Sequence, residues 1–218
     1  MGMDSAILER ILERRVRKER EWLRQRGLHT HIKPDEIRVK GLFGGDTYEN
    51  GGIRIGALAL LGKTLRHELA HRAHLERSFA PTKELRKQKN YPDAFSAEYG
   101  AISEMLAALA EHETMNIVKL ERTTKKAYDN YGDSLGRAAM LLAVRDALLQ
   151  MWKTLRRAGL GRKEAHDAIL HALYNSKTLA DIGIYREVMP KFAALRKTGV
   201  NTNPSEVLAM RWLKRLRT

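Results

Sequence analysis

The residues that could do chemistry are concentrated in one short stretch, His67-Glu68-Leu69-Ala70-His71. Two histidines four residues apart lie about one turn apart on an α-helix, so both imidazoles project from the same face. Such a pair can bind a single tetrahedral zinc ion at about 2.0 to 2.1 Å. Glu68 adjoins the first histidine, where a carboxylate can take a proton from a zinc-bound water instead of binding the metal. The spacing therefore predicts a zinc site with Glu68 as general base.

Composition narrows the kinds of site that the chain can carry. The 218 residues include no cysteine, which excludes disulfides, thiolate zinc sites and cysteine nucleophiles, so any metal site must use His and carboxylates. The first twenty residues lack the apolar core of a signal peptide, and no stretch approaches the run of about 18 apolar residues that spans a membrane. We therefore expect a soluble, cytoplasmic protein whose 43% hydrophobic residues are enough for a real core.

The elements that must position the motif can be read from hydrophobic periodicity. Residues 5–26 have the pattern of an amphipathic helix that ends at Gly27. Residues 29–56 predict two or three short strands, including 36–40 and 52–56, between turn-forming residues. A helical pattern begins at Leu58 and carries the motif, with apolar positions at Leu58, Leu61, Leu65, Leu69 and Ala73.

The rest of the chain is expected to be helical. A long helix starts near Pro92 and runs to the punctuation at Gly132 and Asp133. Further helices are predicted over residues 134–157 and 162–175, a pair over 177–197, and a last one opened by Asn203-Pro204-Ser205-Glu206, which has an Asn cap and Pro in the first helical position. The fold class is therefore α+β and predominantly α.

The stretch from Arg66 to His71, preceded by the strand-like Gly52, Ile53, Arg54, Ile55 and Gly56, resembles the core of zincin metallopeptidases. The small gluzincins are the most similar, including minigluzincins and the ImmA/IrrE and SprT-like groups. The resemblance implies a zinc-dependent peptidase that acts on peptides or proteins, with a small sheet, an active-site helix and a glutamate helix. It also implies that an edge strand before the active-site helix pairs with the substrate backbone, a role that would fall to Gly52, Ile53, Arg54 and Ile55.

By the same resemblance, a glutamate from the next helix supplies the third zinc ligand. We identify it with Glu98, because residues 98–106 are similar to the E-A-N-x-F-A-x-x-L-L stretch of the ImmA/IrrE group. The Asn of that stretch is Gly100 here. In the thermolysin-like pattern an Asp would orient the first histidine, but that position is Ile102, so support for His67 must come from elsewhere.

Other polar residues near the motif are weaker candidates. His74 lies about 4.5 Å beyond His71 along the helix axis, so a straight helix cannot bring all three histidines to one metal. Three residues of the long helix are reserve ligands: Glu104, Glu111 and His112. An oxyanion donor is also needed, and the sequence leaves Tyr91, Tyr99 and Tyr128 as equal candidates.

Charge suggests a second class of function. The formal net charge is +14, and residues 134–218 hold sixteen Lys/Arg against six Asp/Glu. Such an excess favours contact with nucleic acid through the basic C-terminal helices, although a solvated basic surface explains it equally. Residues 163–199 also have a faint helix-turn-helix pattern.

We therefore divide the chain into a zincin-like core with a basic N-terminal helix, 1–132, and a basic helical region, 133–218. The alternatives are a nucleic-acid-binding helical protein with a vestigial or structural metal motif, and a latent peptidase whose own N-terminal segment blocks the cleft.

Overall fold

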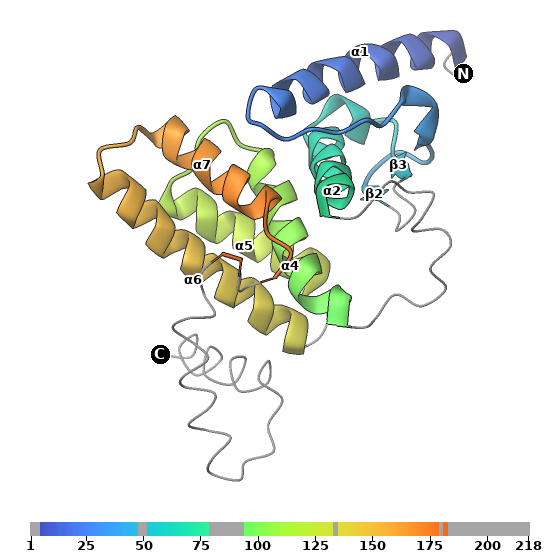
Figure 1. The fold of residues 1–218 in the computed structure, drawn as a ribbon. Helices are drawn as coiled ribbons and strands as arrows, with labels where there is room; N and C mark the ends of the chain where they lie inside the picture. The colour runs from blue at the N-terminus through green and yellow to red at the C-terminus, as the bar shows by residue number, and fades with distance from the viewer. Residues whose placement is uncertain (1–4, 48–51, 79–93, 133–134, 179–180, 183–218) are drawn as a thin grey trace. The chain divides into compact units, whose positions relative to one another are not determined.

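A computed structural model describes residues 5–47, 52–78, 94–132, 135–178 and 181–182 of the chain (Figure 1). Its backbone divides into two compact units, Met1–Lys89 and Asn90–Thr218. This division differs from the expected boundary after residue 132, because helices on both sides of that boundary pack together in the second unit. The catalytic core proposed for residues 1–132 is a functional division and stays a prediction.

The first unit opens with the amphipathic helix that periodicity predicts. Helix α1 spans Ser5–Arg24 and buries Leu12, Val16 and Leu23. The turn after it includes Gly27, whose φ of 74° lies in the left-handed region that glycine adopts without steric cost. The amide of Leu28 then returns to the carbonyl of Leu23 at 3.0 Å, a bond that closes the helix C-terminus and confirms the predicted cap.

A three-stranded mixed sheet follows, with the order β1-β3-β2. Strand β1, Ile37–Val39, pairs in parallel with β3, Ile53–Ile55, and β2, Gly45–Thr47, pairs antiparallel on the other side of β3. The two strands expected over residues 36–40 and 52–56 are thus confirmed. Alternation along β3 places Ile53 and Ile55 in the core and Arg54 on the outer face.

Helix α2, Thr64–Ser78, carries the histidine motif and packs against β2, β3 and α1. It begins six residues later than expected, because a 3₁₀ turn, η2 at Ala59–Leu61, and an extended Gly62 precede it. Its buried apolar face contains Leu65, Leu69 and Ala73, as predicted. Leu58 and Leu61 lie before the helix, so they do not share this face and are 50% and 62% exposed.

The second unit is a bundle of helices (Figure 1). In it, α4, Ala94–Ala110, packs against α5, Ile117–Tyr131, α6, Leu135–Arg157, and α7, Arg162–Tyr174. The single long helix expected up to Gly132 is wrong. It breaks between α4 and α5, where Asn116 caps the second helix by accepting a hydrogen bond of 2.8 Å from the amide of Lys119. The predicted helices at 134–157 and 162–175 are confirmed within their described residues.

Several expectations fall on parts of the chain that the structure does not describe. These are the start of the long helix at Pro92, most of the helix pair over 177–197, the last helix after Asn203 and most of the helix-turn-helix pattern. The basic C-terminal helices as a nucleic-acid surface therefore remain a prediction. Within the described parts, none of the helices combines the length and hydrophobicity needed to cross a bilayer.

Candidate metal centre

The two histidines of the motif face each other on α2, as the one-turn spacing predicts. Their Nε2 atoms lie 3.1 Å apart, and the rings meet edge to face with centroids 4.8 Å apart and an interplanar angle of 74°. His67 is buried at 6% exposure, whereas His71 is partly exposed. The pair is therefore formed within one helix and needs no other element to bring its nitrogens together.

The separation of the two nitrogens suits a shared metal ion. Two ligands at about 2.0 to 2.1 Å from a tetrahedral zinc lie about 3.3 to 3.4 Å from each other, only slightly more than the 3.1 Å observed. The same distance also suits a hydrogen bond from one neutral imidazole to the other, with a proton between the rings. In the hydrogen bond and in the zinc site alike, the two Nε2 atoms point at one shared position between the rings. The two imidazoles therefore fit a metal ion that takes the place of this proton.

Glu68 projects in a different direction from the histidines because consecutive helical residues are about 100° apart. Its carboxylate is turned toward strand β2, where the hydroxyl of Thr47 donates a hydrogen bond of 2.6 Å to Oε2. Gly45 lies beside the same side chain, and a Cβ on this glycine would approach Cγ and Oε1 of Glu68 to 3.0 Å. Glu68 is only 4% exposed. The sheet thus holds the carboxylate in place, and one of its two oxygens is already a hydrogen-bond acceptor.

The expected edge position of residues 52–56 is wrong. Strand β3 is hydrogen-bonded to β1 on one side and to β2 on the other, so its backbone offers no free edge to a substrate. Among the described residues, β2 pairs only with β3, and Glu68 lies against the face of β2 from which the Thr47 side chain projects. Gly52, Ile53, Arg54 and Ile55 could reach a substrate only through side chains, and their part in substrate binding stays a prediction.

A buried ion pair connects the motif helix to α1. The Nε atom of Arg66 donates a hydrogen bond of 2.6 Å to Glu19, which also pairs with Arg15 at 3.1 Å. The guanidinium groups of Arg66 and Arg26 both stack on the Trp22 ring, 4.0 and 3.7 Å from its centroid. Arg66 precedes His67 directly, so this cluster fixes the start of the motif. Sequence analysis missed it, because Glu19 looks like every other glutamate in the arginine-rich helix.

The remaining candidates are distributed over both units. His74 is fully buried on α2. In the second unit, Glu98 is partly exposed on α4 and Glu104 is buried at 8% exposure. Six residues separate these glutamates, which places them about 120° apart around the helix, so one face of α4 cannot present both. The assignment of Glu98 as a zinc ligand stays a prediction.

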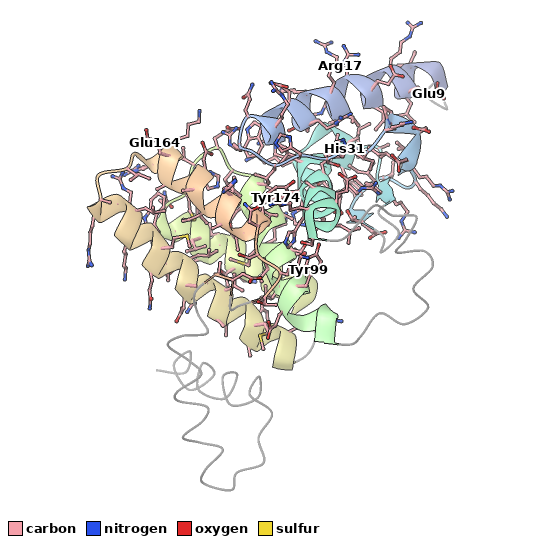
Figure 2. All side chains as sticks on the ribbon, in the orientation of Figure 1. Glu9, Arg17, His31, Tyr99, Glu164 and Tyr174 are labelled. Atoms are coloured by element: carbon pink, nitrogen blue, oxygen red, sulfur yellow. The ribbon has the colours of Figure 1, made fainter. Side chains whose placement is uncertain are left out.

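Two reserve ligands of the second unit have structural partners of their own. Glu111 forms an ion pair with Lys126, and His112 Nε2 lies 3.3 Å from the hydroxyl of Thr123. Of the three tyrosines considered as oxyanion donors, Tyr99 is partly buried, Tyr128 is 42% exposed, and Tyr91 lies outside the described residues. The side chain of Tyr99 can be followed in Figure 2.

Comparisons with protein-family models, with curated proteins and with solved structures gave no match to this chain.

Proposed function

We propose that the chain is a zinc-dependent peptidase of the gluzincin type. The observation that carries the proposal is the pair of imidazole nitrogens 3.1 Å apart on α2, with a buried carboxylate at the intervening position of the motif. A satisfied structural pair of histidines would explain the distance, but it would not require a buried glutamate directly after the first of them. Burying an ionisable carboxylate is costly, and such groups concentrate at functional sites.

The third ligand in this proposal is a glutamate of α4. We assign this ligand to Glu104, which would join His67 and His71 in a set of ligands for one ion. Its burial supports this choice, since a buried carboxylate is stabilised by a cation. Glu98, which the resemblance to the ImmA/IrrE group suggests, is the competing assignment. The donor set of two imidazoles and one carboxylate is the one that catalytic zinc sites of the thermolysin type use.

A zinc ion in such a site supplies Lewis acidity and lowers the pKa of a bound water. Glu68 takes a proton from the attacking water and later delivers it to the leaving amine, as a general base and then a general acid. Thr47 holds Oε2 of Glu68, which leaves Oε1 for the proton. The outer edge of β2 would bind the substrate as an added antiparallel or parallel strand, because its backbone groups have no other strand to pair with among the described residues.

The test is the zinc content of the purified protein and its activity on a peptide library. We expect about one zinc per chain, lost in His67→Ala and in one of the two variants Glu104→Gln and Glu98→Gln. The matched control is His171→Ala, an exposed histidine of α7, which should keep its zinc. Glu68→Gln should keep the metal and lose at least about a hundredfold in cleavage. A protein that takes up no zinc after reconstitution, or loses it equally in His171→Ala, contradicts the proposal.

A further inference from the structure

The first unit contains a hollow that the metal centre does not use. It lies between the second half of α1 and the segment after it, and its volume is about 850 Å³. Its floor includes apolar side chains such as Val16 and Leu28. Its walls are mostly cationic or titratable, with Arg17, Arg20, Arg24, His29 and His31 among them. Arg17 and His31 are labelled in Figure 2, where Arg17 projects outward from α1.

The positive charge of this hollow is only partly compensated. Arg24 donates two hydrogen bonds of 2.8 Å to Glu21, and the Arg24 partner holds the pKa of that carboxyl at about 2, so Glu21 is an anion committed to Arg24. Arg17 and Arg20 form no hydrogen bond or ion pair with other described residues. Glu13 also lines the hollow, without a bond to either arginine. Arg17 and Arg20 therefore border the hollow with guanidinium donors available to a ligand.

The same cationic surface continues along α1 toward its N-terminus. Arg10, Arg14 and Lys18 are exposed and have no bonded partner among the described residues. From Arg10 to Arg24 the helix rises about 21 Å. Residues 9–33 hold nine Lys/Arg against four Glu, an excess of five. A strip of this length is too long for a single phosphate group and suits an extended polyanion, since one strand of a duplex places about six phosphates along about 21 Å of its axis.

We propose that the hollow and the outer face of α1 bind the phosphate backbone of a double-stranded nucleic acid. Among the described residues lining the hollow there is no Phe, Tyr or Trp. Base stacking on aromatic rings is how proteins usually hold single strands, so its absence from this surface favours a duplex. Arginine side chains that contact only phosphates position the protein on the duplex and do not distinguish one base sequence from another. Binding is therefore independent of sequence and falls steeply with salt. It requires neither the metal nor Glu68, so it stands apart from the proposed peptidase activity.

The test is fluorescence anisotropy of the full-length protein with a labelled 20-base-pair DNA duplex at several salt concentrations. Arg17→Gln/Arg20→Gln should weaken binding about tenfold at moderate salt and lower the slope of log K against log salt by about two units. The matched control is Arg38→Gln/Lys40→Gln, which removes the same charge from exposed positions on and just after β1 of the same unit. We expect it to change binding less than about twofold. Circular dichroism checks that both variants are folded.

Four results would overturn the proposal. The first two are no duplex binding by the wild-type protein and equal losses of affinity in the two double variants. The other two are tighter binding of the matching single strand and equally effective competition by a heparin fragment at the same charge concentration. The last result would assign the surface to sulfated polyanions. Wild-type affinity that is unchanged in Glu68→Gln and after chelation supports the separation from the metal site. A protein without zinc that still shows the expected loss in Arg17→Gln/Arg20→Gln would contradict the peptidase and leave this proposal standing.

Discussion

The hydroxyl of Thr47 and the carboxylate of Glu68 are joined by a hydrogen bond of 2.6 Å, and the same hydroxyl lies 3.2 Å from the backbone carbonyl of Glu68. Strand β2 is thereby fastened to α2 at the residue between the two motif histidines. Since Glu68 is almost completely buried, the bond also supplies a polar partner that water cannot easily replace. The position of Glu68, the residue that we propose as general base, thus depends on a strand only three residues long.

Thr47→Val removes this hydroxyl while keeping the shape of the side chain. We expect it to reduce the free energy of unfolding by about 1 to 3 kcal/mol, because a buried carboxylate oxygen loses its donor. Urea denaturation measures the change. Thr47→Ser keeps the hydroxyl and should lose much less. If the two variants were equally destabilised, the methyl group and not the hydrogen bond would be responsible.

Gly45→Ala introduces a Cβ that lies 3.0 Å from Cγ and Oε1 of Glu68 and from Cγ2 of Thr64. The side chain of Glu68 must move, at a cost of about 1 to 3 kcal/mol for overpacking a filled site. We expect zinc to be retained and peptide cleavage to fall, as measured by metal analysis and by kcat/KM. Gly62→Ala is the control, because its Cβ would meet no atom closer than 3.6 Å. Equal cleavage by the Gly45→Ala variant and the wild type would show that Glu68 need not be held where we find it.

Glu19→Ala breaks the buried pair with Arg66. The arginine is left as a buried charge without its carboxylate, which costs about 3 to 5 kcal/mol. Hydrogen exchange of the α2 amides should accelerate strongly, since α2 loses its buried ion pair with α1. Glu21→Ala removes a carboxylate from a more exposed pair on the same helix and should change exchange much less. Similar exchange in both variants would contradict a special role for the buried pair.

The carboxyl of Glu21 should titrate with a pKa of about 2, well below its ordinary value of 4.5, because Arg24 and then Gln25 donate hydrogen bonds to it. A folded-state pKa below the unfolded value stabilises the protein above about pH 4.5, and this contribution is lost as the pH falls toward 2. Carboxyl chemical shifts in an NMR titration report the midpoint directly. In Arg24→Gln the midpoint should rise toward 4.5. A wild-type midpoint already near that value would mean that the pair does not persist in solution.

Sequence patterns predicted the parts of this fold that depend on interactions between residues close together in the chain. The spacing of His67 and His71 determines their relation within one helical turn, and Gly27 marks the end of α1 by its left-handed conformation. The break before Asn116 was missed although its capping residue is visible, because the apolar pattern continues on both sides of it. Leu58 and Leu61 fitted the helical period, but Leu58 caps a 3₁₀ turn and Leu61 is its last residue.

The arrangement of the strands could not be predicted in the same way. Gly45 and Asp46 are turn-forming residues, so β2 has almost no strand signal of its own, and only its pairing with β3 makes it a strand. The position of residues 53–55 at the centre of the sheet follows from contacts with both β1 and β2, which are distant or separated by a turn in sequence. For the same reason the Arg66–Glu19 pair, 47 residues apart, leaves no trace in the spacing of charges.

Trp22, with the guanidinium groups of Arg26 and Arg66 packed on its ring, gives the molecule an optical signal of its own. Arg26 lies just after the end of α1, and Arg66 lies on the motif helix α2. The Trp22 ring therefore contacts one cation from each side of this helix contact. The chain has only two other tryptophans, so a variant with phenylalanine at Trp152 and Trp212 would leave Trp22 as its one indole. The emission of the remaining indole would then shift when α1 separates from α2, even while every helix remains intact.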